Sequence, residues 1–178
     1  GADMTWEFHG KQYGIKSIAY SFHNHKHEGG NPYIMNTEEL LEGWEHIKEA
    51  STSLHRPTKN IEYNPYVRNL LCRNWYQVKH SDGVYAVGTF ENNDNKKLVS
   101  GGTGWAVQMA IDKRKPVYFF DQTTNEWFTY LYEMKKFVCF YSIPTLSENF
   151  AGIGTRNLSE VGAKAIKQLY EYNFNKHG

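Results

Sequence analysis

The strongest constraint on the fold is a short apolar run with glycine at both ends, Gly83–Gly88, in a chain of 178 residues. Such a run is typical of a strand buried on both faces of a parallel sheet. Farther along, Ser100-Gly101-Gly102-Thr103-Gly104 predicts a tight turn that opens a helix to about Lys113, and Val117–Phe120 predicts a second strand. We therefore expect a strand–helix–strand unit within a three-layer α/β domain.

The rest of the chain alternates between helical and strand patterns, as an α/β fold requires. Asn36-Thr37-Glu38-Glu39 has the form of a capping box, and apolar residues follow it at helical spacing. In chain order, the other expected elements are a helix over 3–13 with Asp3 as its N-cap, a strand over 15–20, helices that begin at Asn36 and Pro65, an exposed loop over 91–97, a β-rich edge over 127–143, a strand and turn over 150–156, and a last helix over 158–172.

Composition and charge exclude several classes of protein. With 20 basic and 19 acidic residues, the chain lacks the broad positive field that duplex DNA or an anionic membrane demands. The two cysteines, Cys72 and Cys139, predict neither a disulfide framework nor a cysteine zinc site. No apolar run approaches the roughly 20 residues of a membrane span. We expect one cytoplasmic domain over residues 1–178, without a cofactor.

Three glycine-rich turns each lead into a predicted helix: Gly101-Gly102-Thr103-Gly104, Gly152-Ile153-Gly154-Thr155-Arg156 and Gly1-Ala2-Asp3. Small residues let a phosphate approach the backbone, and the unpaired N–H groups of a helix's first turn bind anions. Because ligands of parallel α/β sheets bind outside the carboxyl ends of strands, we expect the turns to face one site for a phosphate-bearing nucleotide, with Arg156 adding a cation. Any one turn alone is equally consistent with a tight strand–helix connection.

These motifs resemble the Rossmann-like superfamily of the Lonely Guy phosphoribohydrolases and DNA-processing protein A (SLOG). Arg73 precedes Asp82 by the family's nine residues, and Gly101, Gly102 and Gly104 match its GGxGTxxE turn. The turns at the two ends of the chain are similar to the family's first two units, so that the order resembles that of circularly permuted, phage-encoded members. The chain departs from the pattern at Asn74, where Lys is common, and in the loop between Gly88 and Ser100.

The resemblance implies a Rossmann-like sandwich with a mainly parallel sheet and a function in nucleotide binding. Gln108 stands where the family's hydrolases have a catalytic Glu, and an amide can neither transfer that proton nor stabilise an oxocarbenium ion. This favours binding, and sequestration, of an ADP-ribose or cyclic-nucleotide immune signal without cleavage. The alternatives are an N-glycosidase or phosphoribohydrolase that uses Glu7, Asp3 or Asp121, and a module that binds single-stranded DNA.

Several other side chains have two interpretations each. For Trp105, stacking on a base is favoured over packing between helix and sheet, whereas packing is favoured for Trp6. Asp121 ends a strand and could contact a ribose, or simply form a turn. His23, His25 and His27 alternate, but a solvated loop is favoured over a metal site. Relatives with this fold often pair, so a homodimer is expected.

Overall fold

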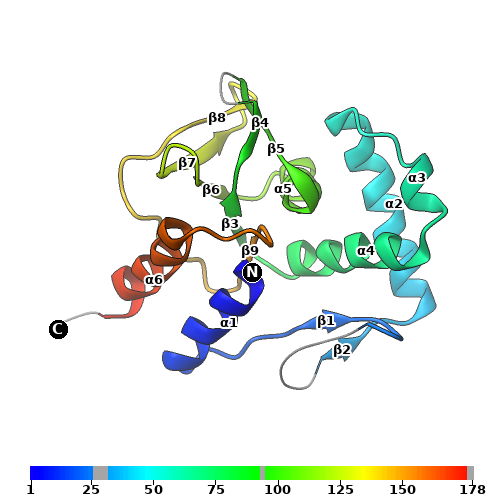
Figure 1. Ribbon diagram of the computed structural model, residues 1–178, viewed down its shortest axis with the longest axis horizontal. Helices are drawn as coiled ribbons and strands as arrows, with labels where there is room; N and C mark the ends of the chain where they lie inside the picture. The colour runs from blue at the N-terminus through cyan, green and yellow to red at the C-terminus, as the bar shows by residue number, and fades with distance from the viewer. Residues whose placement is uncertain (26–31, 93–94, 176–178) are drawn as a thin grey trace.

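The computed structural model describes residues 1–25, 32–92 and 95–175, and its centre is a five-stranded sheet (Figure 1). The strand order is β8-β7-β6-β3-β9. The bounds of these strands, in that order, are Lys136–Cys139, Glu126–Leu131, Val117–Asp121, Gly83–Gly88 and Phe150–Gly154. Strands β6, β3 and β9 run parallel, and β7 and β8 add an antiparallel edge.

Strand β3 lies at the centre of the parallel part, and all six of its residues are buried. Ala86 pairs with Phe119 on one side and with Ile153 on the other. The apolar run therefore forms the doubly covered strand that its sequence predicts. The β-rich segment over 127–143 contributes strands β7 and β8, which form one edge of the sheet, as expected.

Helices cover both faces of the sheet. The side chains of Val84 and Ala86 belong to one core with helices α2 (Thr37–Leu54), α4 (Pro65–Lys79) and α5 (Gly101–Asp112), whereas Tyr85 and Val87 belong to another with α1 (Ala2–Gln12) and α6 (Glu160–Phe174). Figure 1 shows α2 and α4 together on one side of the molecule, with the short α3 (Lys59–Glu62), and α1 beside α6 on the other. The architecture is a three-layer α/β sandwich with a mostly parallel sheet, which is compatible with a Rossmann-like fold.

The helix boundaries follow from local signals in most cases. Asn36 and Glu39 form the predicted capping box, and Pro65 occupies the first turn of α4. The N-cap of α1 is Gly1, so the prediction of Asp3 as that cap is wrong; Asp3 lies in the first turn, where a carboxylate stabilises the positive end of the helix. Among the described helices, none is long and apolar enough to cross a membrane.

Two small sheets lie outside the main one. Strand β1 (Tyr20–Ser21) pairs in parallel with β2 (Tyr33–Ile34), and the rest of the expected strand over 15–20 is irregular. Strands β4 (Phe90–Asn92) and β5 (Asn95–Val99) form an antiparallel ribbon between β3 and α5. The expectation of a loop over 91–97 is therefore wrong at residues 91–92 and 95–97, which form strands, whereas residues 93–94 lie outside the described residues. Phe90 and Val99 anchor the ribbon in the core.

Helices α2 and α4 are joined by a hydrogen-bonded carboxylate, which gives a first prediction. Glu42 accepts hydrogen bonds from Lys79 Nζ and from Trp75 Nε1 at 2.8 Å. These bonds, with that of Lys79 first, lower the pKa of Glu42 to about 2. A lowered pKa contributes stability that is present above the ordinary pKa of 4.5 and is lost as the pH falls towards 2.

Glu42→Gln should therefore lower the free energy of unfolding at pH 7 by on the order of 1 kcal/mol, since solvent screens a half-exposed pair. The loss should shrink as the pH is lowered, because wild type then becomes protonated too. Urea unfolding at several pH values measures this difference. Glu45→Gln, on the same helix, is the control because Glu45 is 67% exposed and pairs only with Lys48 among the described residues. A loss for Glu42→Gln that does not change with pH would show that the charge is not its cause.

Candidate functional site

The carboxyl ends of β3 and β9 form the point at which the connections of the sheet change face. The two strands are adjacent and parallel. The helix after β3, which is α5, lies on one face, and the helix after β9, which is α6, lies on the other. In open α/β sheets the crevice at such a switch point is the usual place for a ligand. The candidate site is therefore sought around Gly88 and Thr155.

The amino end of α5 is open. Its N-cap residue, Ser100, donates its hydroxyl to Thr89 O at 2.9 Å and makes no side-chain cap. Gly101 has a φ of 66°, which suits glycine, and beyond it Gly102 is exposed. A methyl group added at Gly102 would have no atom within 4 Å. The first-turn amides thus have room for an anion and no capping side chain among the described residues.

Contacts tie this helix end to the end of β3. Cγ2 of Thr103 lies 3.8 Å from where a Cβ of Gly88 would be. Arg56 donates from its two terminal nitrogens to Gly101 O at 2.9 Å and to Val99 O at 2.8 Å, and it also pairs with Glu91. Arg56 therefore fixes the turn and places a positive charge beside it. No motif in the sequence singles out this residue, because its hydrogen-bond acceptors are main-chain oxygens more than 40 positions away.

A second turn lies beside the first turn of α1. Thr155 O accepts a hydrogen bond from Ala2 N at 3.1 Å, and a methyl group added at Gly1 would lie 3.0 Å from Cα of Arg156. The predicted turns at the two ends of the chain therefore do meet, and Figure 1 shows the N-terminus next to the loop before α6. Arg156 is exposed, and its guanidinium has no hydrogen-bond or ion-pair partner among the described residues.

The amino end of α6, in contrast, is satisfied internally. Ser159 Oγ accepts a hydrogen bond from Gly162 N at 2.9 Å, and Gln122 Oε1 accepts one from Ser159 N at 2.7 Å. A side-chain cap of this kind occupies the amides that an anion would otherwise use. The turn after β9 therefore offers a ligand the side chain of Arg156 rather than the helix amides.

Arg73 and Asp3 form an ion pair next to this turn, with Nη2 3.5 Å from Oδ2. Both line a cavity of about 690 Å³ together with Gly152 and Arg156. Nε of Arg73 is buried and has no hydrogen-bond partner among the described residues. Burial raises the pKa of Asp3, and the charge of Arg73 opposes that rise. The side chain of Asp3 is still 51% exposed.

Gly152 and Gly154 lie within β9 and not in a phosphate-binding turn. A side chain at Gly152 would collide with the ring of Trp6, and one at Gly154 would lie 2.6 Å from Val87 O and 2.7 Å from Cβ of Ala2. The two glycines are small because helix α1 packs closely on the strand. The spacing of these glycines resembles that of a ligand-binding turn, but close packing of α1 on β9 explains it.

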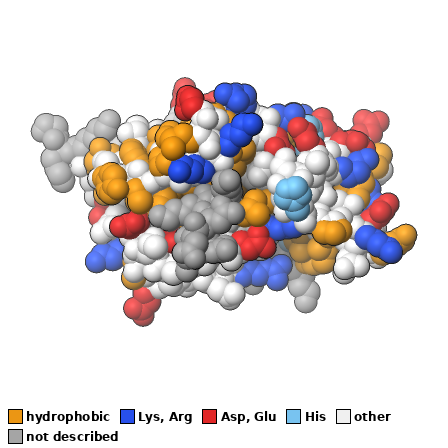
Figure 2. All heavy atoms as spheres, turned by 90° about the horizontal axis from the view of Figure 1, so that it is seen from above, with side chains coloured by type: hydrophobic (Ala, Val, Ile, Leu, Met, Phe, Trp, Pro, Cys, Tyr) orange, Lys and Arg blue, Asp and Glu red, His pale blue; other side chains and the backbone are white. Residues whose placement is uncertain are grey.

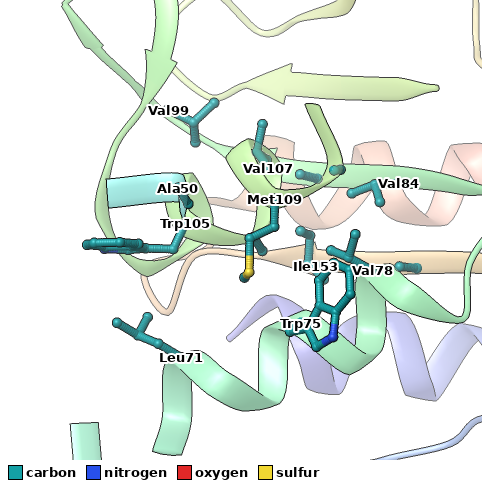
Figure 3. Packing of buried hydrophobic residues seen from close by; sticks show 14 of the residues in the cluster. Ala50, Leu71, Trp75, Val78, Val84, Val99, Trp105, Val107, Met109 and Ile153 are labelled. Atoms are coloured by element: carbon teal, nitrogen blue, oxygen red, sulfur yellow. The ribbon is translucent and has the colours of Figure 1, made fainter. Parts of the chain in front are cut away.

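Trp105 and Gln108 point into the helical layer. Trp105 is 6% exposed, and Figure 3 shows it in the core near Leu71 and Ala50, so its burial supports the packing interpretation. Gln108 is also buried and donates from Nε2 to Asp112 Oδ1 at 2.9 Å. Burial raises the pKa of Asp112. The hydrogen bond to Asp112 thus explains why an amide stands at position 108. It does not indicate whether a ligand bound at the glycine-rich turns is cleaved.

The remaining candidates have structural partners. Asp121 is 1% exposed and accepts hydrogen bonds from Thr123 N and from the amide and hydroxyl of Thr124, which is the turn interpretation. Trp6 packs on β9 and donates to Ile153 O. His25 is hydrogen-bonded to Ser21, and His27 lies outside the described residues. Within the described part of the chain, no group of three or more His, Cys, Asp or Glu side chains is placed to hold a metal ion.

The candidate site therefore consists of the open turn of α5, Arg56 beside it, and the cluster of Ala2, Asp3, Arg73, Thr155 and Arg156 around the end of β9. Comparisons with models of protein families, with curated proteins and with solved structures find no match to this chain.

Proposed function

We propose that this protein binds a small nucleotide-derived anion at the carboxyl ends of β3 and β9. The observation that carries the proposal is the uncapped amino end of α5 at the switch point of a parallel sheet. A phosphate there receives hydrogen bonds from the amides of Gly101, Gly102 and Thr103 and is stabilised by the helix dipole. The close approach is possible because the first two of these residues have no side chain.

Two arginines support the choice of a phosphorylated ligand. Arg156 projects from the turn beside the same strand ends and has no partner among the described residues. Arg73 uses Nη2 for Asp3, which leaves Nε as an available donor. Guanidinium groups bind phosphate oxygens through paired, charge-assisted hydrogen bonds. With the amides of α5, these cations provide for more than one phosphate group, as in ADP-ribose or a cyclic dinucleotide.

The finer identity rests on the resemblance to the SLOG superfamily. In this proposal the order of the units is circularly permuted, and a phage-type protein sequesters an adenine-nucleotide immune signal in the host cytosol, as a homodimer. Retention of the intact ligand is the defining property of sequestration. Gln108 is evidence neither for nor against cleavage of the ligand, because its side chain is hydrogen-bonded to Asp112.

A second candidate is an N-glycosidase or phosphoribohydrolase. The observation that favours it is the carboxylate of Asp3, which has a raised pKa and lies beside Arg73 at the edge of the site. A carboxyl group with a raised pKa is suited to general acid catalysis, in which it protonates the leaving base. Binding of DNA has no such support: Figure 2 shows positive and negative side chains interspersed over the face it presents, and the formal net charge is +1.

The test is to incubate the protein with AMP, ADP-ribose, cyclic ADP-ribose isomers and cyclic dinucleotides, wash it, denature it, and identify the retained compounds by mass spectrometry. Intact ligand on the protein supports sequestration. Free base or ribose phosphate in the wash supports the hydrolase, and loss of that product in Asp3→Asn would identify the acid. If none of these compounds is retained and none is turned over, the proposal is overturned.

Arg156→Ala should weaken retention about tenfold, the cost of one charge-assisted hydrogen bond, without changing the thermal unfolding temperature. Lys167→Ala is the control because it also removes one exposed positive charge, on the last helix, away from the strand ends. Affinities from isothermal titration calorimetry decide the comparison. Equal affinity of Arg156→Ala and Lys167→Ala would remove Arg156 from the site.

A further inference from the structure

A cavity of about 690 Å³ lies beside β9, next to the arginines of the candidate site. Its volume is within the range of about 300–1,000 Å³ that is typical of sites for small molecules. Arg73 and Arg156 line it, and α1, α4 and the segment that leads to β1 form its other walls. Figure 1 shows these elements around the region next to β9. A phosphate on the two arginines would therefore have this cavity directly beside it.

The wall that β9 forms offers hydrogen-bonding groups of the main chain. Among the described residues, β9 pairs only with β3, and Thr155 N donates to Val87 O on that strand. Because neighbouring residues in a strand point their main-chain groups to opposite sides, the C=O of Phe150 and the N–H of Gly152 point away from β3. Both residues line the cavity. An acceptor and a donor are therefore neighbours on this wall, in the arrangement that pairs with a group carrying a donor next to an acceptor.

Aromatic side chains line the cavity from both faces of the sheet. Trp6 belongs to the core on one face and Tyr76 to the core on the other, and both line the cavity. Each is fixed by a hydrogen bond to the main chain: Trp6 donates to Ile153 O at 3.1 Å, and Tyr76 donates to Glu39 O at 2.9 Å. A flat ring that lies in the plane of the sheet would therefore have an aromatic side chain on each of its faces, as a bound base requires.

The charged residues beside the candidate site lie at one end of the cavity. Gly1 lies against Arg156 at the carboxyl end of β9, which places the first turn of α1, with Asp3, at this end. Arg73 pairs with Asp3 through Nη2, while its buried Nε has no partner among the described residues. Carboxylates bind ribose hydroxyls, and guanidinium groups bind phosphate oxygens. Charged groups at this end, and aromatic rings with main-chain groups farther from it, follow the order of phosphate, ribose and base in a nucleotide.

We propose that this cavity binds the nucleoside of the ligand. The base lies in the plane of the sheet between Trp6 and Tyr76, and its edge is hydrogen-bonded to Phe150 O and Gly152 N. This arrangement requires a base with a donor next to an acceptor, such as the N6 amino group and the N1 atom of adenine. The ribose lies beside Asp3. The inference deepens the proposed function and rests on it, because it takes the two arginines as a phosphate site.

The first test changes the ligand by one group. Purine riboside 5′-monophosphate differs from AMP only in lacking the N6 amino group, so it loses the hydrogen bond to Phe150 O. By isothermal titration calorimetry, this analogue should bind the wild-type protein about threefold to tenfold more weakly than AMP does. Inorganic pyrophosphate, which has no nucleoside, measures binding at the phosphate sites alone.

The second test fills the cavity without changing the arginines. Gln77 is half-buried on α4 and lines the cavity. Gln77→Trp should weaken AMP binding by at least about tenfold, because the indole takes the space of the nucleoside, and should leave pyrophosphate binding within about twofold. Asn74→Trp is the matched control: Asn74 is half-buried on the same helix but does not line the cavity, so both affinities should stay at their wild-type values. Thermal unfolding checks that both variants fold.

Failure of this inference and failure of the proposed function give different results. Equal affinity of the wild-type protein for AMP and the purine analogue would overturn the nucleoside subsite, as would equal AMP affinity of Gln77→Trp and Asn74→Trp. In either case, continued binding of pyrophosphate would show that the phosphate sites stand. If neither AMP nor pyrophosphate binds, the proposed function is overturned together with this inference. Should Gln77→Trp not fold, the comparison of AMP with its analogue decides alone, because it uses the wild-type protein.

Discussion

Replacing Gly102 by aspartate should weaken binding of a phosphorylated ligand by about 10- to 100-fold while making the protein more stable. The new carboxylate would occupy the space in front of the first-turn amides of α5, where a methyl group meets no atom within 4 Å. A phosphate at that point would lose charge-assisted hydrogen bonds, which are worth about 1.5–3 kcal/mol each. It would also be repelled by the like charge.

The opposite effect on stability is what makes Gly102→Asp informative. A carboxylate in the first turn of a helix stabilises it by about 0.3–1 kcal/mol, and removing a helical glycine adds about 0.5–1 kcal/mol. The unfolding temperature should therefore rise by a few degrees, about 2–4 °C for each kcal/mol. Calorimetry for binding and thermal unfolding for stability measure the two effects on the same sample.

Gly102→Ala is the matched control, because it also removes the glycine but adds no charge. It should keep the affinity of wild type within about twofold, since a methyl group leaves the amides accessible. If Gly102→Asp retained wild-type affinity for a ligand that the protein binds, the amino end of α5 would not be the phosphate site. The site would then have to be sought around Arg73 and Arg156.

The secondary structure was largely predictable where local chemistry determines it. The capping box at Asn36, Pro65 at the start of α4 and the apolar run of β3 each act within a few residues, so the sequence reveals them. The ribbon of β4 and β5 was missed because its polar residues form a strand through tertiary anchoring by Phe90 and Val99. Packing by distant residues overrides local propensity in such cases.

The site was predictable only in part, since a glycine has the same signature whether it faces a ligand or a neighbouring helix. Gly102 is open, whereas Gly152 and Gly154 are small because Trp6 and Ala2 of α1 pack on β9. Gln108 matched a motif position but faces Asp112, and Arg56 matched none although it fixes the turn of α5. Contacts between residues far apart in sequence decide these roles.

The same helix contains a glycine whose replacement should have the opposite effect on stability. A side chain at Gly104 would overlap the carbonyl oxygen of Val99 and lie 2.9 Å from a guanidinium nitrogen of Arg56. The carbonyl belongs to the end of β5 and cannot move without disturbing the ribbon. Overpacking of this kind costs about 1–3 kcal/mol, against a helix-propensity gain of about 0.5–1 kcal/mol.

Because the added methyl group would overlap main-chain atoms of Val99, the cost lies at the upper end of that range, about 3 kcal/mol. Gly104→Ala should therefore lower the free energy of unfolding by a net amount of about 2 kcal/mol and the unfolding temperature by about 4–8 °C. Gly102→Ala, two residues earlier in the same turn, should instead raise the stability by about 0.5–1 kcal/mol. Urea and thermal unfolding of the two variants test the difference directly. Equal stability of the two would mean that β5 does not press on the first turn of α5. Arg56 donates to both Val99 O and Gly101 O, so a shift at Gly104 should also displace the amides of the proposed phosphate site. Gly104→Ala should then weaken binding of a phosphorylated ligand, whereas Gly102→Ala should not.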